Sequence, residues 1–187
     1  MLQWVAGERR VTNSKELRDV DMYVYAQPAG LLGRYIGRAL RLRVERFAYV
    51  VDANHRMLRR VEVDADSLLP QCEVDSGKFE RLGLNFSEVE RVAIRTRRHV
   101  LDAPRYPRIV YSVEQETPEE VVGSLQLHGE THTVRCSKTL EGPELIVRCP
   151  INAREFNVPT YTHMFGLFSV SPHVEVETRV PLKVLKL

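Results

Sequence analysis

The sequence lacks the features that would place it in a membrane or in an oxidising compartment. No stretch approaches the ~20 apolar residues of a membrane-spanning helix, and residues 1–10 have no apolar core of the signal-peptide type. The 187 residues include three cysteines, Cys72, Cys136 and Cys149, and an odd number makes a poor disulfide framework. We therefore expect a cytoplasmic protein with three free thiols, although an oxidised pair of Cys136 and Cys149 is geometrically conceivable across the hairpin that they flank.

Signatures of catalysis and of nucleic-acid binding are also scarce. No Gly-x-Ser-x-Gly nucleophile elbow occurs, and Gly30, Gly33 and Gly37 are not flanked by the strand–loop–helix unit that a phosphate-binding loop needs. The formal net charge is only +2, which by itself gives no argument for a nucleic-acid partner. We expect no catalytic residue, no cofactor, no metal and no nucleic acid.

The sequence does contain a repeated strand pattern. Hydrophobic residues are 43% and charged residues 28% of the chain, which is typical of a globular protein. Apolar and charged residues alternate over residues 40–44, and the apolar phase then shifts by one residue over 47–51. In a continuous strand, this one-residue slip would turn the apolar side chains of residues 47–51 outward. We therefore expect a β-bulge near Glu45 and Arg46 that keeps them facing inward.

Eight strands and one helix are expected along the chain. The strands cover about residues 22–26, 40–51, 61–65, 108–114, 121–128, 131–139, 144–151 and 169–180. A capping box of Ser87 and Glu90 predicts a helix over 88–101, ended by Pro104 and Pro107, and residues 66–86 are expected to be irregular. No parallel βαβ alternation is present. The pattern therefore predicts an all-β fold with one main helix, arranged as an eight-stranded antiparallel barrel that has room for its own side chains or for one small ligand.

Two segments carry a resemblance to a known family. They are Val100-Leu101-Asp102-Ala103-Pro104-Arg105-Tyr106-Pro107 and Leu125-Gln126-Leu127-His128-Gly129-Glu130-Thr131, supported by residues 63–68 and 154–158. In this order they resemble the YceI-like family, in a branch without export signals. The resemblance covers roughly residues 20–182 and implies a single domain over 1–187, with residues 1–19 as an N-terminal extension. It also implies that the barrel is lipocalin-like.

The same resemblance implies non-catalytic binding or carriage of a long apolar ligand, typically a polyisoprenoid, in the barrel lumen. The partner is then an isoprenoid or a fatty-acyl lipid. Assembly into a homodimer is left as an open alternative. The expected ligand-binding residues are inward strand positions and part of an apolar loop: Leu40, Leu42, Val44, Phe47, Tyr49, Val61, Ile109, Tyr111, Leu125, Leu127, Met164, Phe165, Phe168, Val174 and Val176. The loop, residues 161–168, is interpreted either as a lip over the ligand or as a plug.

Two other functions remain as alternatives. His128 and His132 could approach one another across a hairpin, which leaves open an enzyme or a metal-binding protein, although Gly129 between them favours a structural turn. A ligand-free interaction module, with a lumen filled by its own side chains, is the other alternative. A basic cluster is interpreted as a solvated helix face in preference to a site for nucleic acid or anionic lipid; it comprises Arg91, Arg95, Arg97, Arg98, Arg105 and Arg108.

Overall fold

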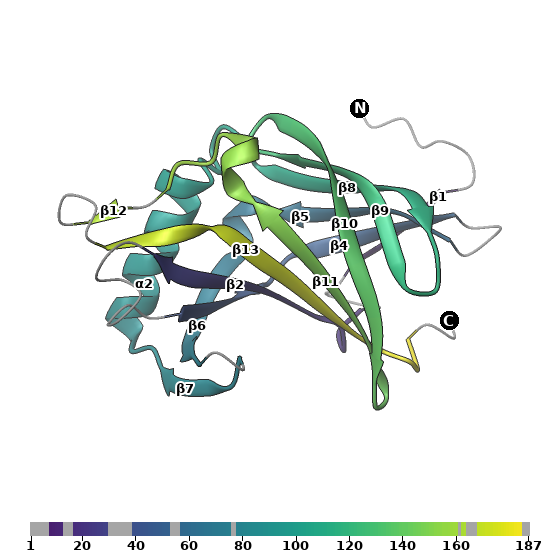
Figure 1. Cartoon of the computed structure of the whole chain (residues 1–187), viewed down its shortest axis with the longest axis horizontal. Helices are drawn as coiled ribbons and strands as arrows, with labels where there is room; N and C mark the ends of the chain where they lie inside the picture. Colours follow the sequence, from purple (N-terminus) through teal and green to yellow (C-terminus); the bar gives the residue numbers. More distant parts are fainter. Residues whose placement is uncertain are drawn as a thin grey trace.

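The fold is a curved antiparallel sheet with one helix packed beside it (Figure 1). The structure, a computed structural model, describes residues 8–12, 17–29, 39–52, 57–75, 78–160, 162–163 and 168–184. The strands are β1 (Glu8–Thr12), β2 (Asp21–Ala29), β3 (Ala39–Val44), β4 (Phe47–Asp52), β5 (Leu58–Asp64), β6 (Leu68–Val74), β7 (Glu80–Gly83), β8 (Arg108–Glu116), β9 (Glu120–Leu127), β10 (Glu130–Glu141), β11 (Glu144–Asn152), β12 (Thr162–His163) and β13 (Phe168–Pro181). The helical segments are the 3-10 turns η1 (Ala65–Ser67) and η3 (Ala153–Phe156), the α-helix α2 (Phe86–Ile94) and its π-helical continuation η2 (Arg95–Val100).

Every strand pair in the described part of the chain is antiparallel. Twelve strands follow one another in the hydrogen-bonded order β1-β4-β5-β8-β9-β10-β11-β13-β2-β3-β6-β7, and β12 pairs with β13 beside them. The predicted all-β fold with one main helix is confirmed. The predicted count of eight strands is wrong, and the order has two ends, at β1 and β7. Four strands (β1, β6, β7 and β12) fall outside the eight predicted ones, and the predicted strand over 40–51 is divided into β3 and β4.

Strand β6 shows why the count failed. Pro70 has no N–H group for a ladder hydrogen bond, which argues against a strand at its position. In the structure Leu68, Cys72 and Val74 are nevertheless buried at alternate positions, and β6 pairs with both β3 and β7. The register with β3 shifts where Pro70 stands opposite Leu42, so an irregularity in the ladder accommodates the proline.

The irregularity predicted at residues 45–46 is present, but it is a break between two strands instead of a bulge within one. The Glu45 N–H donates to the Ser67 carbonyl and the Asp64 N–H donates to the Arg46 carbonyl, both at 3.1 Å. β3 pairs with β6, and β4 pairs with β5. The β3–β4 segment and the β5–β6 segment therefore bend at the same place, and the η1 turn supplies the extra residues in the β5–β6 segment. The bend lets apolar side chains of β3 and β4 face one interior despite the shift in phase.

The helix lies where it is predicted, but its cap is different. Asn85 is the N-cap: its Oδ1 accepts a hydrogen bond from the Glu88 N–H at 3.0 Å, and the Glu88 carboxylate accepts one from the Asn85 N–H at 3.1 Å. The predicted capping box of Ser87 and Glu90 is therefore wrong, because Asn85 is as good an N-cap residue as serine and comes first along the chain. α2 packs on β6. None of the described helices is long and apolar enough to cross a membrane.

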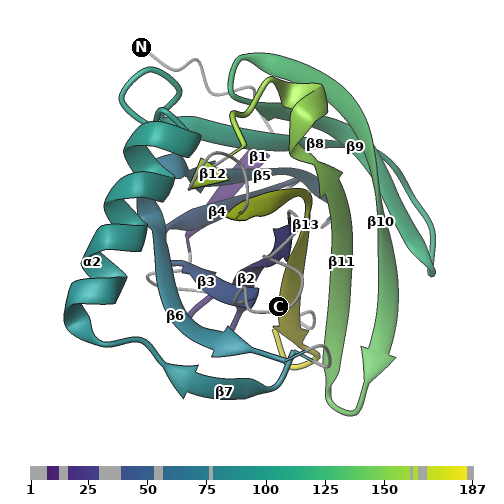
Figure 2. The ribbon, with the colours of Figure 1, turned by 60° about the vertical axis from the view of Figure 1, so that its left-hand side comes forward.

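Most buried apolar side chains belong to one cluster, built by strands that curve around a common interior (Figure 2). Its members come from distant parts of the sequence, for example Met22 on β2, Val134 on β10 and the fully buried Phe156 of η3. The period-two alternation of the strands explains this arrangement, since it sends every second side chain to the concave face.

A cluster of charges surrounds one buried carboxylate on the other face of the sheet. Glu177 on β13 alternates with cavity-facing neighbours, and its side chain is only 1% exposed. Its carboxylate accepts hydrogen bonds from Lys78 Nζ at 3.2 Å and from the Nε atoms of Arg148 and Arg179, each at 2.9 Å. Burial alone would raise the pKa of Glu177, but the hydrogen bonds from Arg179, Arg148 and Lys78 outweigh burial and lower that pKa. The cluster ties the β6–β7 turn to β11 and β13.

Candidate functional site

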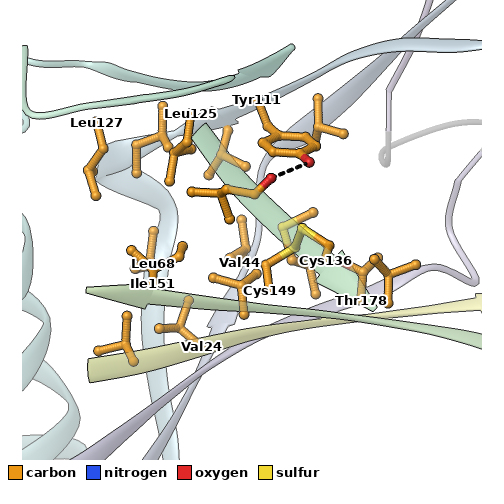
Figure 3. A pocket seen from close by; sticks show the side chains of 18 of the residues that line it. Val24, Val44, Leu68, Tyr111, Leu125, Leu127, Cys136, Cys149, Ile151 and Thr178 are labelled. Carbon is orange, nitrogen blue, oxygen red and sulfur yellow. Dashed lines mark hydrogen bonds between the residues drawn. A yellow bond between two sulfur atoms is a disulfide. The ribbon is translucent and has the colours of Figure 1, made fainter. Parts of the chain in front are cut away.

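A cavity of about 1170 Å³ lies inside the curve of the sheet. It is larger than ordinary small-molecule pockets, which occupy about 300–1,000 Å³. Strands β1–β6, β8–β11 and β13 contribute to its wall, together with α2, η2 and η3. Figure 3 shows aliphatic side chains from opposite walls pointing toward one another, among them Leu125, Leu127, Val44 and Ile151. The wall is dominated by side chains that cannot form hydrogen bonds.

Eleven of the predicted ligand-binding residues line this cavity, and they come from six different strands: Leu40, Leu42, Val44, Tyr49, Val61, Ile109, Tyr111, Leu125, Leu127, Val174 and Val176. Phe47 directly follows the bend, is 5% exposed and packs in the core, so it is not part of the wall. Met164 and Phe165 lie outside the described residues, as does the side chain of Phe168. The lip or plug, and the binding of ligand by any of these residues, stay predictions.

The prediction leaves out a large part of the wall. β10 and β11 contribute Val134, Val147 and Ile151, and the helical segment contributes Val92 and Val100. The strand residues could have been found, because the alternation that singles out Leu125 continues into both of these strands. The helical residues could not, since a helix that packs on the outside of a barrel and one that closes the end of its lumen have the same amphipathic pattern.

Two tyrosine hydroxyls interrupt the apolar wall. Tyr111 Oη lies 3.0 Å from the Val134 carbonyl and 3.2 Å from the Val121 carbonyl, and its proton is available to either (Figure 3). Burial raises the pKa of Tyr111 to about 12, with a smaller contribution from the Glu114 charge. A Cβ at Gly123 would stand 2.9 Å from the Cζ atom of Tyr111 and 2.2 Å from a backbone oxygen of the neighbouring strand, so glycine is what allows the ring to lie there.

Tyr49 contrasts with Tyr111. It lines the cavity, and its ring packs on Phe47 with centroids 5.8 Å apart. Its hydroxyl has no hydrogen-bond partner among the residues that the structure describes, and burial raises the pKa of Tyr49 far above its ordinary value. The hydroxyl is therefore a polar point in an apolar wall that the protein itself leaves unpaired.

A disulfide joins β10 to β11 on the cavity wall. The Sγ atoms of Cys136 and Cys149 are 2.03 Å apart, and the two Cα atoms are 4.2 Å apart. Both residues line the cavity, whereas Cys72 is a buried free thiol. The prediction of three free thiols is therefore wrong. The hairpin pairs Ser137 with Arg148, so the next pair of residues along the two strands is the pair of cysteines.

The two histidines of the metal alternative have separate surroundings. His128 has a left-handed backbone, with φ of 52°, in the turn before β10, and its ring contacts the Tyr106 ring at a tilt of 47°, with centroids 4.5 Å apart. The His132 ring meets the edge of Phe156 at 5.0 Å. Among the described residues, no three histidine, cysteine, aspartate or glutamate side chains are grouped so that they could hold a metal ion. Each of the two histidines therefore contacts an aromatic ring, and they do not belong to a common group of metal ligands among the described residues.

Exposed residues that also line the cavity mark where it approaches solvent. Arg95 and Pro159 do so beside α2 and just before β12. At the opposite end of the cavity, where β1 and the end of β8 lie (Figure 1), the exposed residues that line it are Arg9, Met57 and Glu116. The cavity therefore extends from the helix end of the sheet to the end that holds β1.

The fold is shared with a solved protein. The crystal structure of Burkholderia cenocepacia BcnA is similar, with a TM-score of 0.50 and 16% sequence identity; the match covers 88% of this chain and 96% of that chain. At this identity the likeness concerns the fold alone. No curated protein matches the sequence. The family model of the YceI-like domain matches residues 49–182, which is more than half of the chain, and the chain therefore belongs to the YceI-like family.

Proposed function

We propose that this protein binds a long apolar lipid, an isoprenoid or a fatty-acyl chain, without covalent chemistry in the lumen of a lipocalin-like barrel. The observation that carries the proposal is the cavity of about 1170 Å³ with its wall of valine, leucine and isoleucine side chains. A hydrophobic ligand gains free energy in such a space in proportion to the apolar surface that it removes from water. Membership of the YceI-like family supports the proposal.

The energetics of burial favour a long ligand. Burial contributes about 0.8 kcal/mol per CH₂ group, whereas the lost freedom of the two partners costs about 4–15 kcal/mol. A chain of about 20 methylenes gains about 16 kcal/mol on this scale, which exceeds the cost, and a chain of about five gains about 4 kcal/mol, which does not. We therefore expect affinity to rise steeply with chain length and to need no charged anchor.

The alternatives fit the cavity less well. A ligand-free interaction module would fill its interior with its own side chains, as protein cores do. An enzyme would need reactive groups on the wall, but no histidine of the described chain lines it, and Lys138 is paired with Glu116 at 2.6 Å. The polar groups that remain, such as the hydroxyls of Tyr49 and Tyr111, suit the orientation of a ligand better than its chemical conversion.

The cytoplasmic location stays a prediction from the sequence, and the bond between Cys136 and Cys149 argues against it because disulfides persist mainly in oxidising compartments. A single domain over residues 1–187 and a homodimer stay predictions as well.

A matched pair of variants on β9 tests the proposal. Leu125 lines the cavity and is 5% exposed, whereas its neighbour Gln126 is exposed on the opposite face of the strand. Delipidated protein is titrated with a fluorescent long-chain fatty acid. Leu125→Trp should weaken binding about tenfold, the effect of displacing about two methylenes from the lumen. Gln126→Trp should bind like the wild type; equal affinities for wild type and both variants contradict binding in the lumen.

A further inference from the structure

The exposed large apolar side chains are concentrated in one part of the described surface. Four of the six fall within residues 79–94: Phe79, Leu82, Phe86 and Ile94, which are 73%, 57%, 84% and 47% exposed. β7 is also an end strand of the sheet, so one of its edges has no neighbouring strand in the described structure. Apolar side chains gathered in this way on a protein surface are typical of a contact surface.

Arginines lie beside these apolar side chains, mostly on the helical segment and just after it. Residues 91–108 contain six arginines and one acidic residue, Asp102, in a chain whose net charge is +2. Arg91 and Arg98 are exposed on the helical segment and Arg81 is exposed on β7, and none of the three has a carboxylate partner among the described residues. Three carboxylates lie among these side chains and offset part of this charge. Glu80 is paired with Arg41, Glu88 accepts a hydrogen bond at the helix N-cap, and Glu90 is exposed on the same helix. The positive charge is therefore left available for a partner of opposite sign.

This surface adjoins one end of the cavity. Val92 and Thr96 line the cavity, whereas Ile94, between them in the sequence, is exposed on the outer side of the same helical segment. Arg95 is exposed and also lines the cavity, so the lumen comes close to solvent next to Ile94. Phe86 lies about two helical turns before Ile94. Figure 2 shows β7 leading directly into α2 at this end of the molecule.

We propose that Phe79, Arg81, Leu82, Phe86, Arg91, Ile94 and Arg98 form a docking surface for a lipid bilayer that contains anionic phospholipids. Arginines near an anionic leaflet are attracted by its surface potential, and exposed phenylalanine, leucine and isoleucine side chains enter the boundary between headgroups and acyl chains. The strength of membrane binding is the sum of the electrostatic attraction and the apolar surface buried in the membrane, so the two contributions together give firmer attachment than either alone. Docked in this way, the helix end of the lumen lies against the membrane from which an apolar chain would enter.

Vesicle sedimentation with the full chain tests the proposal. The protein should sediment with vesicles of phosphatidylcholine and phosphatidylglycerol, less so with phosphatidylcholine alone, and less at about 0.15 M salt than at low salt. Each arginine near an anionic surface contributes about fivefold, so the double variant Arg91→Glu, Arg98→Glu should bind at least about 30-fold more weakly. Phe86→Ser should weaken binding about tenfold.

Matched controls lie on β10, whose hairpin with β11 is far from α2 in both views (Figures 1 and 2). The Arg135 side chain is 70% exposed and Leu140 is 66% exposed, and Arg135→Glu and Leu140→Ser should sediment like the wild type. Leu125→Trp should also keep vesicle binding, which separates this surface from the lumen. Wild-type sedimentation by the Arg91, Arg98 double variant or by Phe86→Ser overturns the proposal, as does binding of single-stranded RNA under conditions in which anionic vesicles are not bound.

Discussion

The two tyrosines on the cavity wall should respond differently to the same substitution. The Tyr111 hydroxyl is within hydrogen-bond distance of the Val134 and Val121 carbonyls, at 3.0 and 3.2 Å. Tyr111→Phe removes that donor, so the free energy of unfolding should fall by about 1–2 kcal/mol. The Tyr49 hydroxyl has no partner in the described part of the chain. Tyr49 is only partly buried and its hydroxyl borders the cavity. Tyr49→Phe removes no hydrogen bond and should therefore leave the free energy of unfolding unchanged to within about 0.5 kcal/mol.

The alkaline side of the stability profile gives a second readout. The pKa of Tyr111 is raised to about 12 in the folded protein, against about 10 in the unfolded chain. A raised pKa of an acidic group means that its stabilising effect is complete below about pH 10 and is lost as the pH rises toward about 12. The wild type should therefore lose more stability over this interval than Tyr111→Phe does.

Urea unfolding followed by circular dichroism measures both effects. The proteins are first delipidated, because a bound lipid would stabilise each variant by an amount that depends on its affinity. The midpoints are compared at pH 7 and across the alkaline interval. If Tyr49→Phe destabilises the protein as much as Tyr111→Phe does, the reasoning that separates a paired hydroxyl from an unpaired one is refuted.

Three further predictions concern groups around the cavity. Thiol titration in denaturant without reductant should count one free thiol, Cys72, because Cys136 and Cys149 are bonded to each other. A count of three free thiols would contradict the disulfide. Glu177→Gln should lower the free energy of unfolding by about 3–5 kcal/mol in urea unfolding, because three cations lose a buried partner. Because the pKa of Glu177 is lowered in the fold, the stability that its carboxylate contributes should be lost as the pH falls below the ordinary range of a glutamate. Glu175 also pairs with Lys78 but its side chain is 35% exposed, so Glu175→Gln should cost less. Gly123→Ala should reduce the yield of soluble protein or its melting temperature, because the new Cβ would stand 2.2 Å from the Ser112 carbonyl oxygen, and an unchanged melting temperature would contradict the close approach of these strands.

Alternation made much of the cavity wall predictable. Side chains of a strand point to opposite faces in turn, so Leu40 and Leu42 before the bend, and Tyr49 after it, could be placed inside from sequence alone, and all three line the cavity. The division of the strands was not predictable in the same way. Whether the shift in phase at residues 45–46 becomes a bulge or a break depends on the partner segment, where η1 supplies the extra residues.

The disulfide was predictable in part. The Gly142-Pro143 turn leaves Glu141 opposite Glu144, and a continuous antiparallel register from there brings Cys136 opposite Cys149. The sequence offered this geometry, but the odd number of cysteines favoured three thiols. The unpaired hydroxyl of Tyr49 could not have been predicted, because its lack of a partner depends on what lies across the cavity from β4.

Native mass spectrometry of the freshly purified chain tests the central claim most directly. The lumen of about 1170 Å³ should hold a lipid that adds several hundred daltons to the protein mass, in proportion to the many methylenes that tight binding needs. That added mass should be lost on extraction with organic solvent and be reduced in Leu125→Trp but not in Gln126→Trp. Wild-type protein that carries no lipid, and that takes up none from a mixture of isoprenoids and fatty acids after purification, would contradict the account.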